Sequence, residues 1–118
     1  RSALMAIWEG RCALTGCDLE PVLVASHAKP WKDSSNAERL DPFNGLLLVA
    51  SMDRLFDGGF ISFDDDGGLL PSPSITDAQF AALGVDRHAR LSSLQSRHRP
   101  YLAYHRWRHG YDIAQRES

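Results

Sequence analysis

Short apolar stretches separated by polar turns run along the first half of the chain. Residues 22–25 and 46–50 are apolar runs of strand length, and each follows turn-forming residues, Pro21 in one case and the pair Asn44-Gly45 in the other. The residues between them, 29–42, are polar and rich in turn formers, so we predict a loop, in which residues 36–40 have the composition of one helical turn. Two strands joined by a long loop are therefore expected.

The spacing of apolar positions then changes from that of a strand to that of a helix. Residues 51–57 place Met52, Leu55 and Phe56 on one side of a predicted helix, with Ser51 as its N-cap and two glycines at its end. Residues 60–70 have the pattern of a β-hairpin. Further helices are predicted near residues 2–9, 75–83 and 91–108. The last is interrupted at Pro100 and is held to the core by residues from the set Tyr101, Leu102 and Trp107.

Length and composition favour one α+β domain over residues 1–118. A chain of 118 residues with 43% hydrophobic content can build one core but hardly two. No apolar run approaches the roughly 18 residues that span a bilayer, and the first residues lack a signal-peptide pattern. We therefore expect a soluble, cytoplasmic protein with no membrane partner. Two cysteines are too few for a disulfide framework.

Charge is distributed unevenly along the chain. Residues 1–86 carry six basic and 13 acidic side chains, whereas residues 87–118 carry seven basic and two acidic ones. Arginine interleaved with tyrosine and tryptophan suits phosphate contacts and stacking, although a solvated helix face would have the same composition. The residues that we predict to contact nucleic acid are Arg97, Arg99, Arg106 and Arg108 in the basic helical segment 87–113, with Lys29 and Lys32 after the first strand.

Four polar residues of the strand-strand-helix segment form a candidate site. His27 ends the first strand, Asn44 precedes the second, and Asp53 and Asp57 lie four residues apart on the predicted helix. Side chains at this spacing project from one helical face, where two carboxylates are able to hold one hard cation such as Mg²⁺. A neutral histidine facing that ion is able to take a proton from water. Taken singly, His27, Asn44 and Asp53 also fit structural roles, but together the four residues suit hydrolysis of a phosphodiester.

The stretches SHAKPW, DPFNGLLL and SMDRLFDGGFISFDDDG, within residues 11–67, resemble the HNH nuclease motif of the ββα-metal group. The resemblance implies a ββα-metal core with a β-hairpin and flanking helices. It implies His27 as the general base, Asn44 as a residue that ties the loop and orients the base, and Asp53 and Asp57 as metal ligands. Ser26 stands where relatives often have an acidic ligand, so it is expected to bind metal weakly or through water. Oxygen ligands favour Mg²⁺ or Mn²⁺ over Zn²⁺.

The same resemblance implies a restriction-type DNA endonuclease that acts on a duplex with one divalent cation. A homodimer and a recognition domain preceding Arg1 remain open. Many relatives bind a structural zinc ion through two cysteine pairs, but Val49 and Met52 occupy the positions of the second pair, so no zinc is expected beside Cys12 and Cys17. The alternative, which Ser26 favours, is a noncatalytic DNA-binding or protein-interaction module on the same scaffold.

Overall fold

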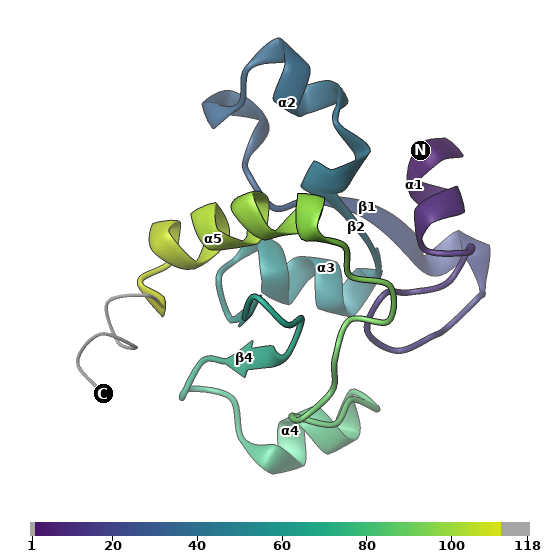
Figure 1. Cartoon of the computed structure of the whole chain (residues 1–118). Helices are drawn as coiled ribbons and strands as arrows, with labels where there is room; N and C mark the ends of the chain where they lie inside the picture. Colours follow the sequence, from purple (N-terminus) through teal and green to yellow (C-terminus); the bar gives the residue numbers. More distant parts are fainter. Residues whose placement is uncertain (1, 112–118) are drawn as a thin grey trace.

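The computed structural model describes residues 2–111 of the chain. Within these residues, five helices and two separate antiparallel hairpins form an α+β architecture, as predicted (Figure 1). The elements are α1 (Ser2–Ile7), β1 (Leu23–His27), α2 (Asn36–Leu40), β2 (Gly45–Val49), α3 (Ala50–Asp57), β3 (Ile61–Phe63), β4 (Leu69–Pro71), α4 (Asp77–Ala82) and α5 (Arg99–Arg108). Short 3-10 turns connect several of them.

The first hairpin and α3 form the centre of the molecule. Leu23 pairs with Val49 and His27 with Gly45, so the connection between the strands begins directly after the histidine. Residues 46–48, three consecutive leucines, are all buried, and because successive side chains of a strand point to opposite faces, both faces of β2 are covered. Helices α1 and α3 both contact this strand. Burial of each leucine side chain contributes about 1.5–3 kcal/mol before the entropic cost of ordering.

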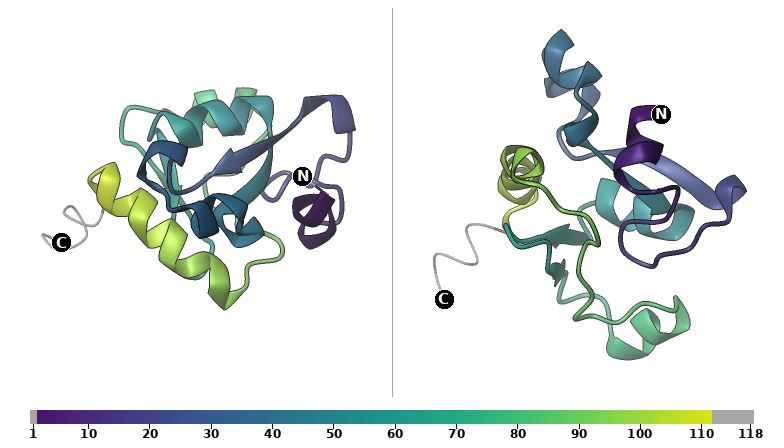
Figure 2. Two further views of the ribbon diagram at one scale, coloured as in Figure 1. Left: turned by 90° about the horizontal axis from the view of Figure 1, so that it is seen from above. Right: turned by 45° about the vertical axis from the view of Figure 1, so that its right-hand side comes forward.

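The approach of α1 is close at one point. A methyl group added at Gly45 would lie 2.9 Å from Cδ1 of Leu4, so a larger residue at this position would require the Leu4 side chain to shift. The connection between the strands, residues 28–44, extends away from the core and carries α2 (Figures 1 and 2). We call residues 28–44 the arm.

Helix α5 is joined to α3 and to the second hairpin through buried His105. The backbone carbonyl of Phe56 can only accept a hydrogen bond, so Nε2 of His105 donates to it over 2.7 Å, and Nδ1 accepts from the Ser62 hydroxyl over 2.7 Å. The imidazole also stacks on the Phe56 ring, with centroids 3.9 Å apart. Burial lowers the pKa of His105 to about 4. A neutral ring therefore links α5 to both α3 and β3.

The structure confirms most of the predicted elements and corrects four details. The region 29–42 is not only a loop, because α2 forms there with a capping box between Ser35 and Glu38. Ser51 is not the N-cap of α3, since β2 passes directly into the helix and Val49 occupies that position. Pro100 lies in the first turn of α5 and does not interrupt a helix, because a proline there leaves no hydrogen bond unmade.

The fourth correction concerns the extent of the last helix, which was predicted from residue 91 but begins at Arg99, after the 3-10 turn Ser96–His98. Residues of the set predicted to hold this helix do pack on the core. Leu102 is buried and Tyr101 is half-buried, as expected, but the Trp107 side chain is 60% exposed. No helix within residues 2–111 is long and apolar enough to cross a bilayer.

The neutral ring of His105 predicts acid sensitivity. A histidine has a pKa near 6.5 when unfolded, so below that pH the unfolded chain binds a proton that the folded chain excludes until about pH 4. The unfolding free energy should therefore fall by roughly 3 kcal/mol as the pH drops through this window. Urea denaturation at several pH values measures the effect against the His105→Gln variant, whose curve should be flatter. Parallel curves for the two proteins would contradict this account.

Candidate functional site

The exit of β1 brings two of the predicted residues together. Ser26 is buried, and its hydroxyl donates a hydrogen bond of 2.5 Å to Oδ1 of Asp53. This contact follows from the chain path, because α3 starts beside the entry of β1 and runs back along the strand, so that its first turn reaches the strand's other end. Asp53 is thereby fixed one residue away from His27. The bond engages one oxygen of the carboxylate.

His27 itself is exposed and borders a cavity of about 150 Å³. Its imidazole meets the Trp31 ring edge-on, with centroids 6.3 Å apart and an interplanar angle of 86°. The cavity is lined by Ser26, His27 and other residues of the first hairpin, by the start of α1, and by Arg39, Leu40 and Asp41 of the arm. Neither Asp53 nor Asp57 lines it. Asp53 is therefore linked to the end of β1 through Ser26, and it does not share a cavity with His27.

Asn44 is fully buried and holds both ends of the arm. Its side-chain oxygen accepts from the backbone N–H of Lys29 over 2.8 Å, and its amide nitrogen donates to the carbonyls of Lys29 at 3.3 Å and Glu38 at 3.2 Å. Its own carbonyl accepts from the N–H of Ala28. These four contacts fix Ala28 and Lys29, which directly follow His27, and Glu38 of α2. Such contacts are what an asparagine that organises the loop requires.

Asp57 lies one helical turn beyond Asp53, exposed at the end of α3. It is close to His109 after α5: burial lowers the pKa of that histidine, Arg108 lowers it further, and the Asp57 carboxylate opposes both effects. Residues 2–111 contain no group of three or more His, Cys, Asp or Glu side chains placed to hold a metal ion. The oxygen donors of Asp53 and Asp57 fit a hard cation that keeps much of its water, such as Mg²⁺.

Cys12 and Cys17 are free thiols, and Cys12 contacts the end of β2. Cys12 is a buried free thiol whose Sγ accepts from the N–H groups of Thr15 and Val49, and Cys17 is a partly buried free thiol. Met52 is completely buried in the core. Cys12 therefore helps to fix the end of β2, and the positions of a second cysteine pair belong to the strand end and the core.

Several basic residues predicted to contact nucleic acid instead bind acidic groups of this chain. Lys29 forms an ion pair of 2.9 Å with Glu38 and lies 4.9 Å from the Tyr104 ring centroid. Arg106 is buried and donates to the Phe63 carbonyl and to Asp65, which places it inside the fold. The two basic side chains are largely withdrawn from water, whereas their partners are less so, with the Asp65 side chain 64% exposed.

The remaining predicted cations are more accessible. Arg97 forms a 3.4 Å ion pair with Asp41 and stacks over Phe43, Arg99 donates to the Asp65 carbonyl, and Arg108 contacts His109. These three side chains and Lys32 lie on exposed positions. They remain candidates for phosphate contacts.

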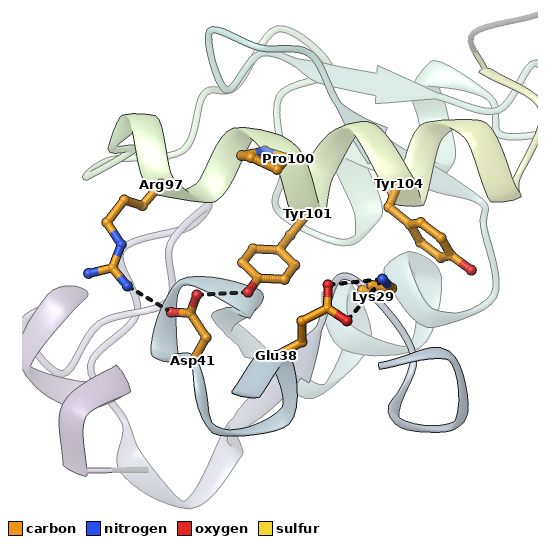
Figure 3. Close-up of a pocket in the computed structure, with 7 residues that line it drawn as sticks. All are labelled: Lys29, Glu38, Asp41, Arg97, Pro100, Tyr101 and Tyr104. Atoms are coloured by element: carbon orange, nitrogen blue, oxygen red, sulfur yellow. Dashed lines mark hydrogen bonds and ion pairs between the residues drawn. The ribbon is translucent and has the colours of Figure 1, made fainter. Parts of the chain in front are cut away.

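A polar cavity of about 350 Å³ separates α5 from the arm (Figure 3). Its lining residues are Lys29, Glu38, Asp41, Arg97, Pro100, Tyr101 and Tyr104. The Tyr101 hydroxyl donates to Asp41 over 2.7 Å, and burial together with this bond raises the pKa of Tyr101 to about 12. Tyr104 likewise donates to Asp33. The cavity is thus spanned by contacts that hold the arm to α5.

Sequence reasoning missed three residues beside His27. Trp31, Arg39 and Leu40 all lie on the arm, and two of them line the cavity that His27 borders. The segment SSNAERL contains the sequence signature of a helix start, because a serine followed three residues later by a glutamate forms a capping box. Recognition of α2 would have placed Arg39 and Leu40 at its end.

Comparison with known proteins identifies a related family and a related fold. Residues 12–64 match the family model described as HNH endonuclease. A solved structure, described as a modification-dependent TagI restriction endonuclease, aligns with 90% of this chain at a TM-score of 0.61 and 20% identity. The chain spans 35% of that protein's length. No curated protein matches the chain. The resemblance to HNH endonucleases and the predicted fold are confirmed, and the family match supports a nuclease function.

The hydrogen bonds of Asn44 predict a large cost for its removal. Asn44→Ala leaves the buried partners at Lys29 and Glu38 unpaired, which should lower the unfolding free energy by about 2–3 kcal/mol. Asn44→Asp should cost at least as much, because a carboxylate would face two carbonyl oxygens. Urea denaturation measures both, with exposed Asn36→Ala as the control, expected within about 0.5 kcal/mol of the parent. An Asn44→Ala variant as stable as the control would refute the anchoring role.

Proposed function

We propose that this chain, whose residues 12–64 match the HNH endonuclease family, is a metal-dependent DNA endonuclease that hydrolyses phosphodiester bonds with His27 as general base. The observation that carries the proposal is the bond between Ser26 and Asp53. It fixes a carboxylate next to an exposed histidine at the end of one strand. This pairing supplies a proton acceptor and a cation ligand at one corner of the molecule.

The chain's own residues account for the base. His27 is exposed, so water and a phosphate can reach it, while Trp31 supports its ring edge-on. A neutral imidazole takes a proton from the water that attacks phosphorus in line with the departing oxygen. Asn44 acts on this step indirectly, since it fixes the backbone that follows the histidine.

Asp53 and Asp57 are the residues that we assign to a divalent cation. When bound, Mg²⁺ or Mn²⁺ supplies positive charge that stabilises the phosphate and the leaving 3′ oxygen. The Ser26 hydroxyl donates a hydrogen bond to Asp53, so we assign Ser26 to orienting that carboxylate rather than to binding the metal. Two carboxylates without a third leave several ligand positions to water and phosphate.

The substrate and assembly are inferred from the same comparisons. We propose double-stranded DNA as the substrate, because the matched family and the neighbouring structure are endonucleases, the latter of restriction type. Since the chain spans 35% of that neighbour, we assign target recognition to other parts of a longer protein. A homodimer would supply a second active site for the other strand.

A noncatalytic DNA-binding module is the second candidate. It is favoured by Ser26, which replaces an acidic ligand, and by the absence of a cluster of three metal-binding side chains within residues 2–111. The two candidates differ in turnover and not in fold.

Loss of the base predicts loss of cleavage. His27→Ala should reduce cleavage of supercoiled plasmid with Mg²⁺ or Mn²⁺ by about 10²–10⁴-fold, because a positioned base contributes that much. The fold should be unaffected, since the side chain is exposed. His88→Ala, at another exposed histidine, is the matched control and should cut at the parent rate. Equal rates for both variants would remove His27 from the mechanism.

The ligand set predicts weak metal binding without DNA. Calorimetry of the free chain should show Mg²⁺ or Mn²⁺ binding of micromolar affinity or weaker, because two carboxylates hold the ion without a phosphate. Ser26→Asp should bind Mn²⁺ more tightly by adding an oxygen ligand beside Asp53, while Asp53→Asn should bind less. Submicromolar affinity in the parent, or no change in either variant, would contradict the assigned ligands.

A further inference from the structure

The outer edge of the arm carries two large apolar side chains in solvent. Leu40, at the end of α2, is 82% exposed, and Trp31 is 59% exposed. Isolated exposed apolar residues are common on protein surfaces. Trp31 and Leu40 are distinguished from such isolated residues because both lie near His27. The Trp31 ring contacts the His27 imidazole edge-on, and Leu40 lines the cavity that His27 borders.

Arg39 is held against Trp31 in a defined orientation. Its Nε donates to the Trp31 carbonyl over 2.9 Å, and its guanidinium lies 4.6 Å from the Trp31 ring centroid. A guanidinium that stacks on an aromatic ring is oriented in advance and loses less entropy when it binds a phosphate. The rings of His27 and Trp31 and the guanidinium of Arg39 thus form a row that starts at the proposed base.

The cavity beside His27 connects this row to the proposed reaction. Ser26 and His27 form part of its wall, and Arg39 and Leu40 form another part. A duplex is a continuous polymer, so a phosphate placed at His27 brings neighbouring nucleotides against this wall. Of the two cavities that adjoin the arm, this is the one that contains His27, whereas the cavity below α5 is spanned by ion pairs and tyrosine hydrogen bonds.

We propose that Trp31, Arg39 and Leu40 form a DNA-gripping edge, in which Arg39 binds a phosphate next to the scissile one and Leu40 enters the minor groove as a wedge. The inference rests on the proposed function in taking DNA as the bound molecule. Phosphate contacts fix the position of a protein on DNA. Apolar side chains inserted from the minor groove partly unstack a base step and bend the duplex. Trp31 holds Arg39 in place.

A wedge has a specific consequence for substrate choice. Unstacking costs less where the duplex is already weakened, for example at a mismatch or at a flexible pyrimidine–purine step. The contribution of Leu40 should therefore be large on a fully paired duplex and small on a duplex with a mismatch at the contacted step. A merely structural Leu40 would affect both duplexes equally.

Binding measurements separate this inference from catalysis. Fluorescence anisotropy in the His27→Ala background, over a range of salt concentrations, compares a paired 20-mer with the same duplex carrying a mismatch beside the central phosphate. Leu40→Ala should weaken binding to the paired duplex about tenfold and to the mismatched duplex less than twofold. Leu19→Ala is the matched control, since Leu19 is also 58% exposed but precedes the other end of β1. It should bind both duplexes like the parent.

Arg39 is tested through the salt dependence. Arg39→Ala should lower the slope of log Kd against log salt by about one, because one phosphate contact is lost. Arg39→Lys should keep the slope but bind more weakly, since an ammonium does not stack on Trp31. Arg90→Ala is the control, because exposed Arg90 donates to a carbonyl in the β3–β4 turn. Urea midpoints verify that each variant is folded.

The outcomes distinguish the two proposals. Equal losses on both duplexes for Leu40→Ala, or a salt slope for Arg39→Ala equal to that of Arg90→Ala, would overturn the gripping edge while leaving the endonuclease assignment intact. The expected binding differences together with a parent chain that never cuts plasmid would support the gripping edge and reject the endonuclease.

Discussion

The absence of any linker between β2 and α3 is the constraint on which the site depends. Val49 is both the last residue of the strand and the N-cap position of the helix, so the direction of β2 fixes the direction of α3. The helix returns along β1, and its first turn arrives where Ser26 can donate to Asp53. The buried leucines of β2 fix the hairpin between α1 and α3, and through it the position of the helix. The chemistry at the strand end is therefore set by packing that lies away from it.

Much of the uneven charge along the chain is satisfied internally. The acidic groups of the arm and of the β3–β4 turn bind side chains of α5 and of the 3-10 turn before it, including Arg97 with Asp41 and Arg106 with Asp65. Tyrosine hydroxyls add hydrogen bonds to Asp33 and Asp41. A basic segment read alone resembles a nucleic-acid surface, but here Arg97 and two tyrosines bind the arm, and Arg99 and Arg106 bind the β3–β4 turn. The cations left accessible are fewer than the composition implies.

The sequence predicted those helices and strands whose formation depends on neighbouring residues in the chain. The apolar run before His27, the helical spacing of Met52 and Phe56, and the helix pattern near residues 75–83 each involve only a few neighbouring residues, and the corresponding elements formed. The contact between Ser26 and Asp53 was not predictable in the same way, because it depends on the absence of a linker after β2. The burial of Arg106 depends on a turn 41 residues earlier, which composition cannot reveal. The sequence motif identified the candidate site residues, whereas their geometry depends on contacts between residues that are far apart in the chain.

His105 shows that the boundary of the sequence motif is not the boundary of the folding unit. The family match ends at residue 64, yet the Phe56 ring is covered and its carbonyl is satisfied by a side chain from α5. A fragment cut at the end of the motif would expose that aromatic face and leave the last turn of α3, with Asp57, unsupported. Any transplant of this fold into another protein must therefore carry the chain through Arg108, including segments with no recognisable motif of their own.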